Sequence, residues 1–600
     1  MNEILKTGFL GDDPSDALAA LKAAINSHVL PFLADWWDPE DPIPTEDEIA
    51  ALQDAIAKRA EQAPLADAYR ELPELLKLLA QGFRFNRRNY VNIHPSPFVP
   101  STLASFIVAL QNPNNIVEEV SKATTAMERE SVLWLAENLF GISDPDKSGA
   151  WGNVVSGGTV ANMTALLVAR DYTYDKLNRP RTARIGSRGV IGAKPGVVLG
   201  TAATHYSIDK ALWFLGLGSE NLIRVPVCRD EWLKQEEFKE TRFLAGIQQE
   251  PWKTQIADAF HEDQVLGDKE LNAFYAGEQS PFGLQPLNSQ ILKTLYSCFQ
   301  FDVPLIGCVL TLGTTDTGTI ERMDSRAIEI LRREDIFLHV DAASGGFAFT
   351  SEHVKPKLNK LEDMNSFTVD PHKMGFLHYP CGAVIFRDDG FKQQIKQEAP
   401  YLGPLAPTLE GSRPGSGSAA LWLSTKTLTV EGYRNAINHL LAFTGLLASA
   451  LAKTGKYQVL HKVDLNALAI APLPKHNETR LYVNELVERI RERFLSPGAD
   501  FLINKDERLA GVKVRNVPYD KKSNEIVDIK ALRIVVTNPL VRMEDAQRLA
   551  DLLAEYLDDA RKEAAILGGQ SMMPQFSQAI GTPTDRKKSK HDHPFLSEEP

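Results

Sequence analysis

The spacing of hydrophobic residues changes along the chain, and each spacing predicts a different kind of structure. Residues 14–37 carry apolar positions at helical intervals, and an acidic, proline-rich linker then leads into a second predicted helix over 47–62. From about 100 to 425, short apolar runs alternate with helical patterns; the runs are GVVLGTA, LIRVPV, LIGCVLTLG, IFLHVDAA, SFTVD and CGAVIF. Apolar strands interleaved with helices predict an α/β domain whose largely parallel sheet is covered on both faces.

The length of the chain favours more than one domain, because 600 residues exceed what a single hydrophobic core holds. The segment 228–300 is polar and helical in character and is interpreted as an insertion. From about 455 onward, the order strand, helix, strand, helix predicts a small α+β domain. We therefore expect an N-terminal helical segment over 1–99, a large domain over 100–450, a small domain over 451–567, and a polar, disordered tail over 568–600.

Composition narrows the classes of function. Acidic residues outnumber basic ones by 78 to 66, whereas a nucleic-acid-binding protein usually has a basic surplus. The cysteines, Cys228, Cys298, Cys308 and Cys381, have no C-x-x-C spacing and form no convincing metal site. No apolar run approaches the roughly 20 residues that span a bilayer, and the N-terminus lacks the pattern of a secretory signal. We expect a protein of the reducing cytoplasm, without nucleic acid, membrane or metal as partners.

Charged residues stand at the ends of two neighbouring predicted strands. Asp341 ends IFLHVD, while Asp370, His372 and Lys373 follow SFTV. Buried charges are costly unless they meet a partner, and active sites of such sheets lie beyond the carboxyl ends of the strands. A lysine in this context either extends outward to solvent or is partly desolvated, with a lowered pKa, and forms an imine with a carbonyl group.

Asp341 also has two interpretations. A carboxylate at a strand end usually caps a turn, but it can instead face a protonated ring nitrogen, which pyridoxal phosphate (PLP) needs to act as an electron sink. Small residues follow Asp341 and allow a flat group to approach the backbone. Ala343 could then lie under the ring.

Three further motifs precede both strand ends in the chain. NVVSGGTVANMTALL, residues 153–167, predicts a strand, a glycine turn and a helix, an arrangement that binds phosphate through backbone N–H groups and the helix dipole. His205, in THYS, is either a structural histidine or a ring that stacks on the face opposite Ala343. Thr315, in TLGTTDTG, is either a cap or a contact to the cofactor or substrate carboxylate.

Together and in this order, the motifs resemble the group II PLP-dependent amino acid decarboxylases of fold type I, over roughly residues 85–545. The most specific pair is HVDAASGGF with DPHKMGF, supported by VVSGGTVANMTAL, THYSIDKA, LTLGTTDTGTIE and EGSRPGSGSAALW. THYS, DPHKMG, APYL and EGSRPGSGSA look most like bacterial tyrosine decarboxylases. The resemblance implies a mostly parallel seven-stranded sheet, a small C-terminal α+β domain, and a homodimer with its active site at the subunit interface.

The resemblance also implies a role for individual residues. Lys373 would hold PLP as an imine, and Asp341 would pair with the pyridine nitrogen. Ala343 and His205 would sandwich the ring. Tyr401 matches a tyrosine on a mobile loop that protonates carbon after carbon dioxide leaves. The phosphate would be held by Ser156, Gly157, Gly158 and His372, with Thr315 nearby, and the loop 410–419 would reach the phosphate of the neighbouring subunit.

The chain departs from the family pattern around the expected substrate pocket. Many relatives carry an aromatic residue at the position of Ser344 and tryptophan at that of Met374. The candidate contacts to the substrate in this region are Asn92, His94, Ser344 and Asn538. Arg87 and Arg88 leave an acidic substrate open, although we expect both at the surface.

The predicted function is decarboxylation of an L-amino acid to its amine, with a tyrosine-like substrate favoured over aspartate or glutamate. Two related activities share the fold: cleavage of a carbon–carbon bond in phosphorylated amino alcohols, and an oxygen-consuming reaction that releases an aldehyde. A non-catalytic PLP-binding protein is a further alternative.

Overall fold

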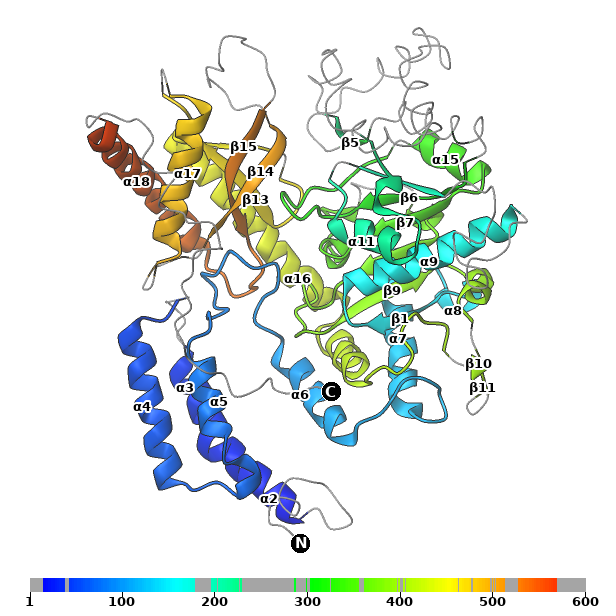
Figure 1. Ribbon diagram of the computed structural model, residues 1–600, viewed down its shortest axis with the longest axis horizontal. Helices are drawn as coiled ribbons and strands as arrows, with labels where there is room; N and C mark the ends of the chain where they lie inside the picture. The colour runs from blue at the N-terminus through cyan, green and yellow to red at the C-terminus, as the bar shows by residue number, and fades with distance from the viewer. Residues whose placement is uncertain are drawn as a thin grey trace, which may run out of the picture.

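The fold is described from a computed structural model (Figure 1). The structure describes most of residues 15–568; the gaps of more than three residues are 38–42, 178–195, 229–284, 287–297, 299–302, 356–360 and 513–526. Nearly all of the predicted insertion over 228–300, the tail over 569–600 and Tyr401 lie outside the described residues. The boundaries of the four predicted segments stay predictions.

Helices form the N-terminal part of the chain and extend away from the rest of the molecule (Figure 1). α2 (Ser15–Ala24) continues through a π-helical turn (Ile25–Val29) into α3 (Leu30–Trp36), and α4 (Glu46–Gln62) and α5 (Leu72–Leu79) follow. Thr45 and Glu48 form a capping box, with Thr45 N 2.7 Å from Glu48 Oε2, which fixes the start of α4. The helices predicted over 14–37 and 47–62 are therefore present almost to the residue.

A seven-stranded sheet forms the large domain, as predicted, in the order β1-β9-β8-β7-β6-β2-β3. The six predicted apolar runs become β2 (Val197–Thr201), β3 (Leu222–Val225), β6 (Leu305–Thr311), β7 (Phe337–Asp341), β8 (Ser366–Val369) and β9 (Gly382–Phe386), and β1 spans Trp151–Val155. Only β9 runs antiparallel to its neighbours β1 and β8. Thr311 and Asp341 are partners in the parallel register of β6 and β7, so both strands end at the same edge.

Helices cover both faces of this sheet, each over its own hydrophobic core. α9 (Gly158–Lys176) and α11 (Tyr206–Phe214) pack over one face, around residues such as Ala165, Ile208 and Val384. The other core contains buried residues of α7 (Lys122–Asn138), α15 (Ser325–Arg333) and α16 (Ser416–Thr454). The remaining helices of this region are α6 (Val99–Gln111) and the short α8 (Pro145–Ser148).

The C-terminal part is an α+β unit, as the pattern predicted. Its antiparallel sheet has the order β12-β13-β15-β14, from β12 (Tyr457–Val459), β13 (Ala467–Pro472), β14 (Asn504–Val512) and β15 (Val527–Val535). The unit also contains α17 (Arg480–Phe494) and α18 (Met543–Gly568), and α18 packs against α16. The strand β14 was not predicted, because its sequence NKDERLAGV is rich in charge.

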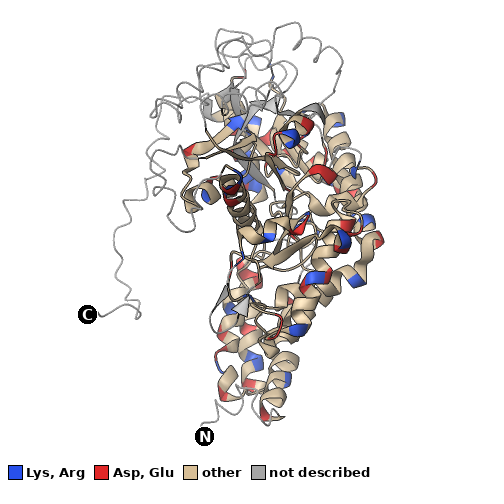
Figure 2. Ribbon diagram, turned by 90° about the vertical axis from the view of Figure 1, so that its right-hand side faces the viewer, with Lys and Arg blue, Asp and Glu red and all other residues tan. Residues whose placement is uncertain are grey.

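Two helical stretches have the length and composition of a membrane span, Ser15–Trp36 and Ser416–Thr454, which corrects the expectation that no apolar run is long enough. Core helices pass the same test, and α16 buries Tyr433, Ile437 and Phe443 in the main core. Basic and acidic residues are interspersed over the described elements (Figure 2), without a basic stripe along one element.

Candidate active site

A cavity of about 350 Å³ opens at the carboxyl ends of the central strands. Ten predicted site residues line it: Ser156, Gly157, Gly158, His205, Thr315, Asp341, Ala343, Ser344, His372 and Lys373. They come from five separate motifs between residues 156 and 373. The parallel register of β6, β7 and β8 explains why they meet, because consecutive strands end at one edge of the sheet.

Lys373 lies in a turn after β8, with its amine inside the cavity. Its Nζ lies 2.9 Å from Oδ2 of Asp370, and only 11% of the lysine side chain is exposed. Burial alone would lower the pKa of Lys373, but the negative charges of Asp370 and Asp341 outweigh burial, so the pKa is raised. The expectation of a lowered pKa is therefore wrong in this structure.

His372 is fixed by a backbone contact. Its Nδ1–H donates to the carbonyl oxygen of Cys381 at 2.6 Å, which leaves Nε2 as the acceptor nitrogen of the neutral ring. Burial lowers the pKa of His372, although Asp370 opposes this effect. The ring also packs against that of Tyr379, with 3.9 Å between centroids and an angle of 33° between the ring planes.

Asp341 ends β7 and is buried. Its Oδ1 accepts a hydrogen bond from the backbone N–H of Ala343 at 3.1 Å, and its Oδ2 accepts one from the Asn162 amide at 2.9 Å. These two donors fix the orientation of the carboxylate at the edge of the cavity. Asp341 is thus suited to face a positively charged group in the cavity.

The glycine turn after β1, residues 156–158, forms another part of the cavity wall. Gly157 is the N-cap of the 19-residue helix α9, so the first backbone N–H groups of the helix are free to bind an anion. The turn is packed closely: a Cβ on Gly158 would lie 2.8 Å from Oδ2 of Asp370, and a Cβ on Gly382 would lie 2.5 Å from Cα of Gly157. Larger residues would fill the space beside the turn.

His205 caps the N-terminus of α11, so it has a structural role. The backbone N–H of Ser207 donates to His205 Nδ1 at 3.3 Å, and Ser207 Oγ lies 2.9 Å from the same nitrogen. Burial lowers the pKa of His205, which favours the neutral ring. The ring nevertheless lines the cavity, so one residue serves both interpretations.

Comparison with known proteins identifies this arrangement. The pyridoxal-dependent decarboxylase conserved domain matches residues 289–471, which include Asp341 and Lys373. A probable L-tyrosine/L-aspartate decarboxylase of Methanopyrus kandleri is 29% identical over 314 residues, 51% of this chain and 62% of that protein. An L-2,4-diaminobutyrate decarboxylase of Acinetobacter baumannii is 22% identical over 502 residues, 80% of this chain and 82% of that protein. Residues 289–471 thus match a pyridoxal-dependent decarboxylase domain, and the relatives that the chain resembles are named as amino acid decarboxylases.

The alignments with the first relatives are partial, since they span 62%, 45% and 51% of the lengths of those proteins. The fold agrees over a larger part of the chain. The glutamate decarboxylase domain of the Vibrio parahaemolyticus diaminobutyrate-pyruvate transaminase and L-2,4-diaminobutyrate decarboxylase has a TM-score of 0.65 at 17% identity. That comparison covers 92% of this chain and 98% of the other, and at this identity it shows the fold alone.

The residues of the cavity fit pyridoxal phosphate, the cofactor of this decarboxylase family. An amine, a carboxylate and a phosphate-binding turn are the three groups that the aldehyde, the ring nitrogen and the phosphate require. In addition, the buried Oδ1 of Asp370 has no hydrogen-bond partner among the described residues, so a polar group beside Lys373 would satisfy it. Ala343 Cβ would lie 3.2 Å from a Cβ on Gly158, which places the small residues of both motifs together.

Some of the predicted site residues lie outside the cavity. The Asn92 amide donates to Asn89 Oδ1 at 3.4 Å, the Asn538 amide donates to Phe85 O at 3.1 Å, and neither side chain lines the cavity. His94 packs its ring against Tyr379, 4.9 Å between centroids, and so lies behind a residue of the cavity wall.

Arg87 and Arg88 are buried, not at the surface as expected. Arg87 Nε lies 3.4 Å from Asp545 Oδ2, and Arg88 Nη2 lies 3.8 Å from Asp545 Oδ1. Both arginines therefore tie the N-terminal segment to α18. Neither lines the cavity in the described structure.

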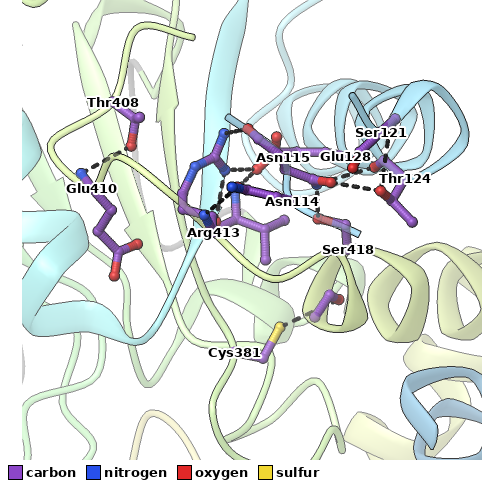
Figure 3. Close-up of polar contacts among 12 residues, drawn as sticks. Asn114, Asn115, Ser121, Thr124, Glu128, Cys381, Thr408, Glu410, Arg413 and Ser418 are labelled. Carbon is purple, nitrogen blue, oxygen red and sulfur yellow. Dashed lines mark hydrogen bonds and ion pairs between the residues drawn. The ribbon is translucent and has the colours of Figure 1, made fainter. Parts of the chain in front are cut away.

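The loop 410–419 turns its arginine inward (Figure 3). Arg413 is an ion-pair partner of Glu128 of α7, and it also donates to Val154 O at 3.1 Å and to Asn115 O at 2.9 Å. Glu128 in turn accepts from Val154 N at 2.7 Å. The loop thus anchors the end of β1, two residues before the glycine turn, and its contact with a second subunit stays a prediction.

The cavity lining also includes residues that were not predicted from the sequence, among them Asn162, Tyr206, Ser207 and Tyr379. Asn162 lies inside the SGGTVAN motif at the start of α9, but the side of the helix that faces the cavity depends on how α9 packs on the sheet. Tyr206 and Ser207 follow His205 directly. Tyr379 lies six residues after Lys373, in a loop whose path the sequence does not reveal.

Proposed function

We propose that the chain is a PLP-dependent decarboxylase that converts an L-amino acid to its amine and carbon dioxide. The observation that carries this proposal is the convergence of Lys373, Asp341 and the glycine turn in one cavity. Bound PLP supplies an electron sink for the carbanion that remains when carbon dioxide leaves. The protein must hold the ring nitrogen protonated, which is the task of Asp341, and must orient the substrate carboxylate perpendicular to the ring.

The direct test is incubation of the PLP-loaded protein with each amino acid in turn, followed by identification of the amine. Borohydride reduction and peptide mapping should place the cofactor on Lys373. Lys373→Ala, the matched control, should form neither the adduct nor the amine. An adduct on another lysine, or no amine from any amino acid, contradicts the proposal.

We infer that the substrate side chain is aromatic. Tyr206 and Tyr379 line the cavity, and His94 packs against Tyr379, so aromatic rings form part of the cavity wall. The relatives act by name on tyrosine or aspartate and on diaminobutyrate, so the family alone does not decide. An acidic substrate would need a basic residue in the pocket, and the candidates Arg87 and Arg88 pair with Asp545 instead.

Measured kcat/KM for tyrosine, aspartate and diaminobutyrate distinguishes these substrates. We expect tyrosine to be preferred, and Tyr379→Ala to lower kcat/KM for tyrosine more than Tyr379→Phe does, because only the first removes the ring. Hydrogen peroxide measured beside the amine separates simple decarboxylation from the oxygen-consuming reaction. Turnover of phosphorylated amino alcohols would point to the lyase alternative, and PLP binding without any turnover would point to a non-catalytic protein.

We propose that a second copy of the chain completes the active site. α6 exposes Val99, Leu103, Phe106, Ile107 and Leu110, a face that a partner would cover. α11 begins at the cavity with Tyr206 and exposes Trp213 and Phe214 at its other end, which supports an interface beside the site.

Light scattering tests this assembly. We expect a dimer for the wild type and a monomer for the double variant Leu103→Glu with Ile107→Glu. Leu481→Glu, on an exposed position of α17, is the control and should remain dimeric. A monomeric wild type that turns over an amino acid at full rate contradicts the shared site.

A further inference from the structure

A chain of buried polar side chains lies behind Asp341, and the proposed chemistry does not use it. His339 precedes Asp341 by two residues on β7, so both side chains project from the same face of the sheet. His339 Nε2 lies 2.9 Å from Asn162 Oδ1, and His339 Nδ1 lies 2.8 Å from Ser366 Oγ. The Asn162 amide nitrogen then lies 2.9 Å from Asp341 Oδ2 and 2.8 Å from Ser207 Oγ.

The direction of each hydrogen bond follows from one fixed point. An ionised Asp341 only accepts, so Asn162 presents its amide N–H to it and turns its oxygen toward His339. His339 Nε2 must then carry a proton. Burial lowers the pKa of His339 to about 4, so the ring is neutral near neutral pH, and its Nδ1 accepts from the Ser366 hydroxyl.

The second amide hydrogen of Asn162 extends the chain to His205. It donates to Ser207 Oγ, and the Ser207 hydroxyl donates to His205 Nδ1 at 2.9 Å. The backbone N–H of Ser207 points to the same nitrogen at 3.3 Å. His205 Nδ1 is therefore an acceptor, and the proton of its neutral ring stands on Nε2.

We propose that Asn162 is a positioning residue that couples the two sides of the cofactor site, because it holds the Asp341 carboxylate and fixes the tautomer of His205. A single amide is suited to this task, since its two hydrogens serve one acceptor on each side while its oxygen is held by His339. Asn162 acts through Asp341 and His205 and does not itself transfer a proton. The proposal rests on PLP binding, not on which reaction follows.

The first test compares two variants of α9. Asn162→Ala removes the coupling, whereas Thr164→Ala removes another buried polar group that bonds only to Val160 O of its own helix. We expect the dissociation constant for PLP, titrated by visible absorption, to rise about tenfold or more in Asn162→Ala, because a hydrogen bond to a charged group is lost. Thr164→Ala should change it less than about twofold at a similar loss of thermal stability.

The second test asks whether His339 acts by orienting Asn162. His339→Gln keeps an N–H donor for Asn162 Oδ1, and His339→Leu does not. We expect His339→Gln to retain most of the PLP affinity and His339→Leu to behave like Asn162→Ala. Equal PLP affinities for Asn162→Ala and Thr164→Ala, or equal losses in both His339 variants, would overturn the proposal. Because PLP binding is measured without turnover, these results are independent of the decarboxylation assay.

Discussion

The amine of Lys373 lies 2.9 Å from Oδ2 of Asp370, and both side chains are buried. The carboxylate stabilises the ammonium form and raises the pKa of Lys373 against the effect of burial. An amine attacks an aldehyde only after it has lost its proton. We therefore expect this ion pair to govern the pH at which PLP binds to Lys373 covalently.

Replacement of Asp370 by asparagine should make Lys373 reactive at lower pH. With the carboxylate gone, burial dominates and lowers the pKa of the amine. Stopped-flow measurement of the visible band after mixing with PLP should show the midpoint of the rate–pH profile below that of the wild type. Lys373→Ala gives the baseline without a covalent band. An unchanged midpoint would show that Asp370 does not control the amine.

The two glycines of the turn after β1 should differ in their tolerance of alanine. A Cβ on Gly158 would lie 2.8 Å and 3.1 Å from the carboxylate oxygens of Asp370, whereas the nearest atom to a Cβ on Gly157 is His372 Cε1 at 3.7 Å. We expect Gly158→Ala to lower Tm by several degrees in the absence of PLP and Gly157→Ala to change it little. Equal Tm values for the two variants would contradict this prediction.

The strand ends of this fold could be predicted from sequence, because charged residues after apolar runs meet wherever parallel strands end at one edge. This is why Asp341 and Lys373 were assigned to one site before any geometry was known. Asn162 could not be assigned in this way, since its role depends on the angle at which α9 crosses the sheet. Arg87 and Arg88 were misplaced because an Arg-Arg pair usually lies in solvent, and their partner Asp545 is more than 450 residues away in the chain.

The ion pair of Arg413 and Glu128 should be essential to the stability of the large domain. Both side chains are buried, so Arg413→Met or Glu128→Gln leaves the other group without its partner, at a cost of about 3–5 kcal/mol. Urea unfolding measures this loss, and PLP affinity should also fall because the pair holds β1 next to the glycine turn. Arg129→Met, which breaks the exposed pair between Arg129 of α7 and Asp146 of α8, should cost less than about 1 kcal/mol. A small change in Arg413→Met would contradict the assignment.

His339 should make the protein less stable in acid. Burial lowers the pKa of His339 from 6.5 to about 4, so between these values the unfolded chain binds a proton that the folded protein does not. The free energy of unfolding should therefore fall as pH falls through this window, by about 3 kcal/mol more in the wild type than in His339→Gln.

The carboxyl group of Glu321 changes the free energy of unfolding with pH in the opposite direction. The wild type must therefore be compared with His339→Gln. Its burial raises its pKa to about 7, so its contribution is present in acid and is lost as pH rises from about 4.5 to 7. Since Glu321 is present in both proteins, its effect cancels in the difference between them. Urea denaturation of wild type and His339→Gln at several pH values from 4 to 7 isolates the histidine, and parallel curves would show that His339 does not titrate as its burial requires.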